Sequence, residues 1–281
     1  MKPAEGTTLC FPDGAKSCFA CCPPIRPAGY EHVRYETMVK RVLRENTRAF
    51  RADEREVRPI TGFSCWALGY LDPACRLVGC LLHPARHGGE DLRFRVDFGE
   101  KCRREICPEA AVFDRLTAQD QAFWLHLADG LNAFAYSSRC RNPLFHLLNW
   151  GTEILQAIAA EADAPARGLT TLLDAFPFLG TRLSPRGWSY PVKRLAAIRG
   201  PGLFRQPVVT TKLEAGLLGL LERSDPVDVS AQPADTLPTH RLPMDRSFLD
   251  FLRLSFGIQR ISLLDAQTLK SRVDVEIERL L

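Results

Sequence analysis

Cysteines near the start of this chain are the residues whose type and spacing could do chemistry. Ten cysteines occur in 281 residues, and nine of them lie within the first 107 positions: Cys10, Cys18, Cys21, Cys22, Cys65, Cys75, Cys80, Cys102 and Cys107. Such a density indicates disulfides in an oxidising compartment and metal ligands or redox groups in a reducing one. Because nine is an odd number, complete disulfide pairing within this region is excluded.

Three close pairs of cysteines predict a metal site: Cys18 with Cys21, Cys75 with Cys80, and Cys102 with Cys107. The first pair has C-x2-C spacing, which lets two thiolates bind one tetrahedral zinc ion or one iron–sulfur cluster. The other two have C-x4-C spacing, at the loose end of the range found for zinc ligands. The plain alternative is that these cysteines are small buried hydrophobic residues. Their concentration in the most polar, turn-rich part of the chain favours metal binding.

Cys21 and Cys22 are adjacent, and this raises a separate question about their roles. In an extended segment, successive side chains point to opposite sides. Cys22 therefore need not bind the ion held by Cys18 and Cys21. It could reach a second site or a neighbouring iron of a cluster.

Two passages carry a resemblance to a known family, "CFACCPP" and "SCWALGYLDPACRLVGCLLHPAR". With the later cysteine group, they resemble the zinc- or iron-chelating family with a CxxCxxCC signature, the YkgJ-like cysteine-cluster proteins. The resemblance covers roughly residues 10 to 110. The matching positions are the last three cysteines of the signature and two cysteines of the later passage: Cys18, Cys21, Cys22, Cys65 and Cys80.

The match departs from the family pattern at one signature position. Ala15 stands where the first signature cysteine falls, so Cys10 would have to replace that ligand from further away. The group "EKCRREIC" is an addition to the pattern. The resemblance implies metal chelation by the matched cysteines, and one branch of the family is associated with flagellin lysine methylation.

Three functions agree with these residues. The first is a structural or regulatory metal-binding protein, with zinc favoured by all-thiolate ligands. The second is an iron–sulfur protein for electron transfer or sensing. The third is an enzyme, such as a protein methyltransferase, whose cysteine module only supports the fold. The chain has no phosphate-binding glycine loop, no H-E-x-x-H and no G-x-S-x-G, so familiar nucleotide, metalloprotease and esterase motifs do not support an enzyme.

Composition gives expectations about location and partners. The first residues lack the apolar core of a secretory signal, and no uncharged apolar run is long enough to cross a membrane. The net charge of +4 is too small to indicate nucleic acid or an anionic membrane. We therefore expect a cytoplasmic protein whose partner is a metal ion, zinc or iron. The sequence identifies no protein partner.

The elements that position the cysteines are expected to be mainly α-helical. Residues 30–53 have helical apolar spacing on a charged background, whereas residues 61–107 are broken by Gly, Pro and Asp and predict short strands and turns, with "RLVGCLL" the best strand. Beyond Pro108, one helix is expected over 117–138 with Thr117 as its N-cap, and another over 143–164 with Pro143 near its start.

The remaining helices are expected at 169–176, 212–224, 246–256 and 264–281. The predicted fold class is mainly α, with an irregular cysteine-rich metal-binding module that contains short strands. The predicted organisation is a cysteine-cluster module at 1–110, a helical region at 111–223, a linker or long loop at 224–243, and C-terminal helices at 244–281.

Overall fold

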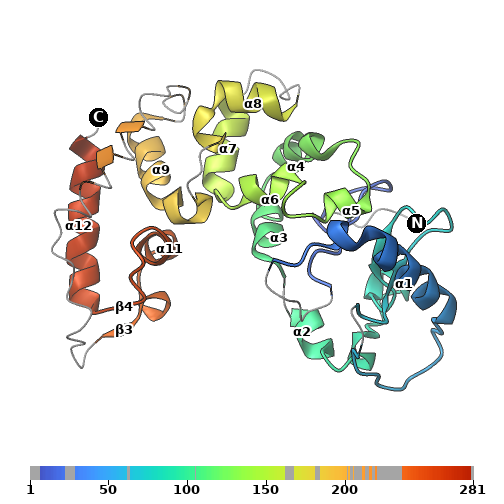
Figure 1. Cartoon of the computed structure of the whole chain (residues 1–281). Coiled ribbons are helices and arrows are strands. Elements are labelled where there is room, and N and C mark those ends of the chain that lie inside the picture. The colour runs from blue at the N-terminus through green and yellow to red at the C-terminus, as the bar shows by residue number, and fades with distance from the viewer. Residues whose placement is uncertain are drawn as a thin grey trace. The chain divides into compact units, whose positions relative to one another are not determined.

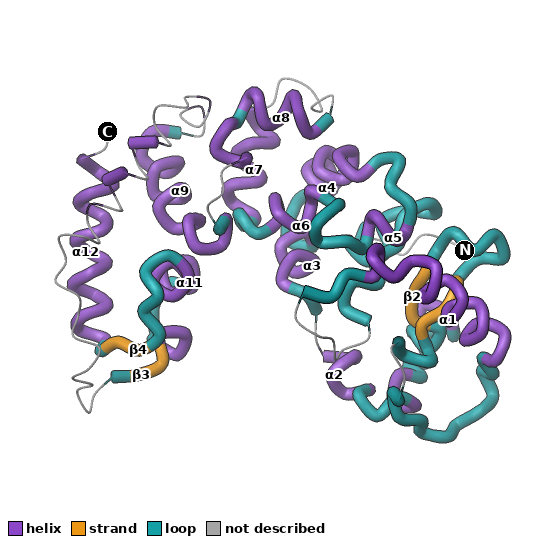
Figure 2. The backbone as a smooth tube through the Cα atoms, viewed as in Figure 1, coloured by secondary structure: helices purple, strands orange, loops and turns teal. Residues whose placement is uncertain are grey.

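The computed structural model describes residues 7–22, 29–61, 64–104, 106–161, 168–180, 184–200 and 236–279, with the single positions 202, 205, 211, 212, 215, 216 and 219. The chain divides into two compact units, Met1–Phe145 and His146–Leu281. The described residues are mainly helical, with two small antiparallel sheets of two strands each (Figures 1 and 2). This confirms the predicted mainly α fold with short strands in the cysteine-rich part.

The first unit is built around helix α1 (Glu36–Ala49), which follows the 3-10 helix η1 (His32–Tyr35). Val39 and Leu43, four residues apart, are fully buried on one face of α1, as an amphipathic helix requires. This buried face packs against strand β1 (Leu68–Tyr70). The helix thus gives the irregular cysteine-rich segments a hydrophobic surface to pack on.

Strands β1 and β2 (Val78–Cys80) form a hairpin in which Leu68 lies opposite Cys80. This confirms the strand predicted in "RLVGCLL". Gly69 is required in β1 because a Cβ there would lie 2.7 Å from both Leu81 Cδ1 and Thr47 Oγ1. Thr47 Oγ1 also accepts a hydrogen bond from the Tyr70 backbone N–H at 2.8 Å. The hairpin is therefore fixed directly on α1.

Short helices follow the hairpin in the first unit. They are η2 (Pro84–Arg86), η3 (Arg93–Arg95), α2 (Gly99–Arg104), α3 (Pro108–Phe113), α4 (Ala118–Leu125), η4 (His126–Ala128) and α5 (Ala133–Tyr136). Thr117 caps α4 as predicted, accepting from the Asp120 N–H at 3.2 Å. The prediction of one helix over 117–138 is wrong. The chain turns at Gly130, with a φ of +79°, and Asn132 caps a new helix, because positive φ ends a right-handed helix.

The helix predicted over 143–164 is also divided. Pro143 begins helix α6 (Pro143–Leu148), and helix α7 (Thr152–Glu161) follows it. Gly151 separates them, with a φ of +92°. Trp150, in the turn between the two helices, and Ile154 on α7 are both buried in the core.

In the described residues of the second unit, α7 and the elements that follow it enclose a core rich in aromatic residues. They are α8 (Leu169–Ala175), η5 (Pro177–Gly180), α9 (Pro185–Arg199), η7 (Thr239–Arg241), α11 (Arg246–Leu254) and α12 (Leu263–Arg279), with a small sheet of β3 (Leu237–Pro238) and β4 (Arg260–Ile261). Helix α9 packs against α7, α11 and α12. Tyr190 on α9 contacts Phe248 on α11, with ring centroids 5.0 Å apart. The helices predicted near 169, 246 and 264 are confirmed.

Parts of the predicted organisation fall where the chain is not described. Most of the helix predicted at 212–224 and the first part of the linker, 224–235, lie outside the described residues. Residues 236–243 include β3 and η7. The first compact unit also extends past the predicted end of the cysteine module at 110, because it includes α3 to α5.

Candidate metal centre

The first cysteines lie in an irregular segment, residues 7–22, that is held against α5. The Cys18 backbone N–H donates to the Cys10 carbonyl at 2.8 Å, which brings these two residues side by side. The hydroxyl of buried Tyr136 on α5 donates to the Leu9 carbonyl at 3.0 Å. Cys10 is therefore next to Cys18 although eight positions separate them in sequence, which suits its predicted role as the replacement for a ligand at position 15.

Cys107 is the N-cap residue of α3, and its Sγ accepts from the Ala110 N–H at 3.3 Å. Two residues further on, Glu109 is only 3% exposed and forms an ion pair with Arg139. Burial raises the pKa of the Cys107 thiol to about 11, with Glu109 and Cys21 adding to the effect and Arg139 opposing it. The side chain of Cys107 therefore lies within range of the charges of Cys21 and Arg139.

Four cysteines lie near one another around this point, and we call Cys10, Cys18, Cys21 and Cys107 the first thiol group. Burial first, and then the charges of Cys21 and Cys107, raise the pKa of Cys10 to about 12. The pKa of Cys18 is also raised, first by burial and then by Cys10, Cys21 and Cys107. Each member therefore lies within electrostatic range of the others.

A second set of cysteines lies at the hydrophobic core beside the β1–β2 hairpin. Cys65 is buried in this core, and the partly buried Cys22 and Cys80 pack against it. The Asn46 amide on α1 donates to the Cys65 carbonyl at 3.0 Å, and Cys80 is the last residue of β2. These three cysteines come from separate parts of the sequence and share one apolar surface.

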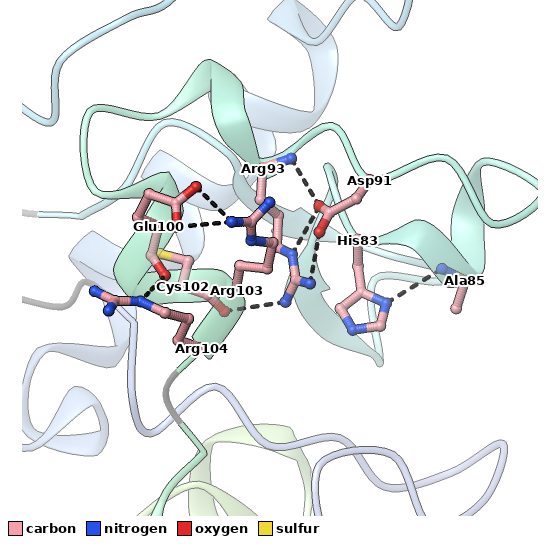
Figure 3. A network of polar contacts seen from close by, with 8 residues as sticks. All are labelled: His83, Ala85, Asp91, Arg93, Glu100, Cys102, Arg103 and Arg104. Carbon is pink, nitrogen blue, oxygen red and sulfur yellow. Dashed lines mark hydrogen bonds and ion pairs between the residues drawn. The ribbon is translucent and has the colours of Figure 1, made fainter.

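Cys102 joins this set from helix α2. Its backbone N–H donates to the carbonyl of Phe98, and the Phe98 side chain packs against the same core. Figure 3 shows Arg93 between Asp91 and Cys102. Arg93 Nη2 pairs with Asp91 at 2.8 Å, and its Nη1 donates to the Cys102 carbonyl at 3.0 Å. Arg93 thereby ties α2 to the segment that follows the hairpin.

We call Cys22, Cys65, Cys80 and Cys102 the second thiol group. Burial first, and then the charges of Cys80 and Cys102, raise the pKa of Cys65 to about 12. Burial also raises the pKa of Cys80 to about 11; Cys102 adds to the effect and Arg93 opposes it. These four thiols therefore act on one another electrostatically, as those of the first group do.

The adjacent pair connects the two groups. A hydrogen bond with Cys21 raises the pKa of Cys22, and burial, Cys80 and Cys65 act in the same direction. The pair lies at a turn closed by the Cys22 N–H and the Phe19 carbonyl at 3.0 Å, and not in an extended segment as expected. Cys21 is exposed, whereas Cys22 faces the core. The two side chains are therefore in contact with each other, with Cys22 against the core and Cys21 at the surface.

Two cysteines and two histidines take other positions. Cys75 is exposed at the hairpin turn with a φ of +56°, and Cys140 is exposed with its Sγ 3.1 Å from Ser138 Oγ. His83 Nδ1 accepts from the Ala85 N–H at 3.3 Å, and His87 Nε2 lies 2.7 Å from the Leu81 carbonyl oxygen. The histidines therefore make local backbone contacts in and around η2.

All ten cysteines are thiols, including the adjacent pair. In the described part of the chain, no three His, Cys, Asp or Glu side chains take up an arrangement that would hold a metal ion as it stands. The predicted convergence of at least four cysteines at metal-binding distance therefore stays a prediction. The candidate ligands are all thiol sulfurs and lie in two groups of four cysteines. Four thiolates are a ligand set that suits zinc or an iron–sulfur cluster.

Sequence reasoning missed the two arginines that lie beside the thiols, Arg93 and Arg139. The neighbouring Arg103 pairs with Glu100 on the exposed face of α2, and Arg104 donates to the Glu100 carbonyl (Figure 3). The closeness of Asp91 and Arg93 in sequence was a signal for one ion pair. The pairing of Arg139 with Glu109 had no local signal, because 30 positions separate the residues.

A search for membrane-spanning helices and three comparisons with known proteins complete the description. No described helix is both long enough and apolar enough to cross a lipid bilayer. A scan against protein-family models, a search of curated proteins and a search of solved structures find no significant match to this chain.

Proposed function

We propose that this chain is a metal-binding cysteine-cluster protein that holds zinc or an iron–sulfur centre. The observation that carries the proposal is the gathering of eight cysteines into two neighbouring groups of four in the first compact unit. Chance packing of small hydrophobic residues does not favour thiols at the surface of a core, next to one another and next to arginines. Four thiolates are the complete ligand set of a structural zinc ion or a cubane cluster.

The surroundings favour a mainly structural or electron-carrying role. Closed sites with four protein ligands stabilise a fold, whereas catalytic zinc sites keep one position open for water or substrate. The segments that carry the thiols are irregular, and a bound metal would contribute free energy of folding by linking them. His32, which is buried beside the thiols, contacts the Cys22 carbonyl through Nε2, and His83 and His87 also make backbone contacts, so these histidines do not serve as evident acid–base partners.

Metal analysis of the full chain purified without oxygen tests the proposal. We expect zinc, or iron with acid-labile sulfide, in amounts comparable to the protein. Colour separates the two, because an iron–sulfur protein is brown and a zinc protein is colourless. Absence of both metals, with no uptake when zinc or iron and sulfide are supplied, would show the proposal to be wrong.

A substitution separates a structural site from a catalytic one. Cys21→Ser is expected to lower metal content and melting temperature together, since loss of one ligand exposes the others to exchange. Cys75→Ser is the matched control, because Cys75 lies at the exposed hairpin turn, and it should change neither quantity. A Cys21→Ser protein that kept its melting temperature would contradict a structural role.

A further inference from the structure

We propose that His32 is a positioning residue for the candidate metal centre, and that it acts by holding the backbone of the adjacent cysteines in the orientation that metal binding needs. This inference rests on the proposed function and names a residue outside the thiols on which that function depends. The observation that carries it is the contact between His32 Nε2 and the carbonyl oxygen of Cys22, made by a histidine that is only 3% exposed.

The direction of the hydrogen bond between His32 and Cys22 follows from its two atoms. A carbonyl oxygen can only accept, so His32 Nε2 carries the hydrogen. In the neutral ring Nδ1 is then the acceptor, and the Tyr30 hydroxyl lies 3.0 Å from it. Tyr30 therefore donates to His32, and His32 donates to Cys22. These two hydrogen bonds fix the tautomer and the orientation of the ring.

Aromatic packing holds the His32 ring in place as well. Its centroid lies 4.6 Å from that of Phe19, and Phe19 meets Phe134 on α5 edge-on, with centroids 5.2 Å apart. Phe19 and Phe134 belong to the same hydrophobic core as Val33, the residue that follows His32 on η1. The core therefore positions the ring, and the Nε2–H donor has a fixed place beside the cysteines.

The group that His32 holds lies at the end of the turn that contains the adjacent cysteines. The Cys22 N–H closes this turn on the Phe19 carbonyl at 3.0 Å, and the Phe19 N–H donates to Ser137 Oγ at 3.0 Å. These two hydrogen bonds fix the beginning of the turn, and the bond from His32 fixes the carbonyl at its end. The backbone of Cys21 and Cys22 is thus oriented before a metal ion binds.

Orientation of the backbone matters because it sets the direction of both thiols. Without the His32 donor, the Cys22 carbonyl would have to turn toward water or remain without a hydrogen bond, and an unpaired buried carbonyl is costly. Such a rotation would change the directions of the Cys21 and Cys22 side chains together, since they belong to one turn. Partners that orient metal ligands in this way typically contribute about 10- to 100-fold in metal affinity.

The alternative is that His32 only fills space in the core, and two substitutions in the full chain separate these roles. His32→Phe keeps an aromatic ring against Phe19 and removes the donor. His32→Gln keeps an N–H donor on a side chain of similar length and removes the ring. Val33→Ala is the matched control, because it removes buried volume from the same 3-10 helix and its apolar side chain donates no hydrogen bond.

The readout is the rate at which the protein, purified without oxygen with its own metal, loses that metal to excess EDTA, followed by metal analysis of the protein fraction. We expect His32→Phe to lose metal about tenfold faster than the unchanged protein, or to be folded and purify with less metal. His32→Gln should lose metal at close to the unchanged rate. Val33→Ala should lower the melting temperature and leave the rate of metal loss unchanged.

Other results would overturn the inference in distinguishable ways. An unchanged rate in His32→Phe, or a faster rate in His32→Gln than in His32→Phe, would show that the donor is not required, and the proposed function would stand. Where His32→Phe does not fold, Tyr30→Phe removes only the hydroxyl that donates to His32. It should lose metal faster than the unchanged protein, and an unchanged rate would contradict the inference. An unchanged protein that neither contains nor takes up metal would contradict the proposed function itself.

Discussion

At the scale of single residues, burial and neighbouring charge set the chemistry of the thiols. Burial is the largest cause of the raised pKa of Cys10, Cys65 and Cys80, because a low-dielectric environment disfavours the thiolate. A metal ion must displace these protons on binding. The neighbouring arginines act in the opposite direction, and Arg93 lowers the pKa of Cys80. The charged residues around the thiols therefore matter as much as the thiols.

The ion pair between buried Glu109 and exposed Arg139 gives a residue-scale prediction. Arg139→Ala leaves the carboxylate of Glu109, which is 3% exposed, without its partner, and we expect a loss of about 2 kcal/mol in the free energy of unfolding. In a Glu109→Gln background the same change should cost much less, since no buried charge is left. Urea unfolding of the four proteins measures this cycle. Equal costs of Arg139→Ala in both backgrounds would contradict the coupling.

Tyr190 gives a prediction about pH in the second unit. Burial and its hydrogen bond to Asp274, 2.5 Å long, raise the pKa of Tyr190 to about 12. The folded state therefore keeps a proton that the unfolded state loses near pH 10, so this contribution to stability is complete below about pH 10 and is lost as pH rises toward 12.

The Tyr190→Phe protein lacks this titration and one hydrogen bond. Near pH 8 we expect it to be less stable than the unchanged protein by about 1 kcal/mol, and the difference should shrink between pH 10 and 12. Melting temperatures across this range test the expectation. A difference that stays constant or grows with pH would show that Tyr190 does not titrate in this way.

At the scale of elements, short helices are joined by glycines with positive φ. Gly130 separates α4 and η4 from α5, and Gly151 separates α6 from α7. Apolar spacing alone predicted one continuous helix in each place, because periodicity continues across such a break. The break matters for the candidate sites, since α5 meets the segment of Cys10 and Cys18 only after the turn.

A substitution at Gly151 tests whether the break is required. Gly151 has a φ of +92°, and a Cβ there has space, with Lys193 Cε 3.9 Å away. Gly151→Ala should therefore cost about 1–2 kcal/mol through backbone strain and not through a clash. Gly180→Ala is the matched control in the same unit, with its nearest contact at an ordinary 3.6 Å and no positive φ. Unfolding free energies that fall equally in both variants would contradict this explanation.

At the scale of the whole molecule, the chain forms two compact units with different kinds of support. The first unit, Met1–Phe145, contains all ten cysteines and the irregular segments that carry them. The second, His146–Leu281, has a core of aromatic and aliphatic side chains from α9, α11 and α12. The first unit would depend on metal for part of its stability, and the second would not.

Hydrogen exchange of the full chain tests this difference. Removal of metal by a chelator without oxygen should speed amide exchange in residues 7–22 and 64–104 and leave α9, α11 and α12 unchanged. The same chelator saturated with zinc is the control. Faster exchange in both units alike, or in neither, would contradict a metal requirement confined to the first unit.

The sequence by itself determined the fold class, the cap at Thr117, the strand at "RLVGCLL" and the candidate thiols. These features depend on neighbours within a few positions, so apolar period, turn residues and spacing are sufficient to predict them. The sequence also showed that Cys21 and Cys22 could serve different ions. It could not show which distant cysteines accompany each of them.

Only the tertiary structure decided how the thiols are grouped. The C-x4-C spacing suggested Cys102 with Cys107, yet Cys102 lies with Cys65 and Cys80, and Cys107 lies with Cys10. The physical reason is that α1 and the hairpin bury one set of cysteines against a common core, while α3 and α5 hold the other. Packing between elements far apart in sequence sets these neighbours, and local spacing carries no information about it.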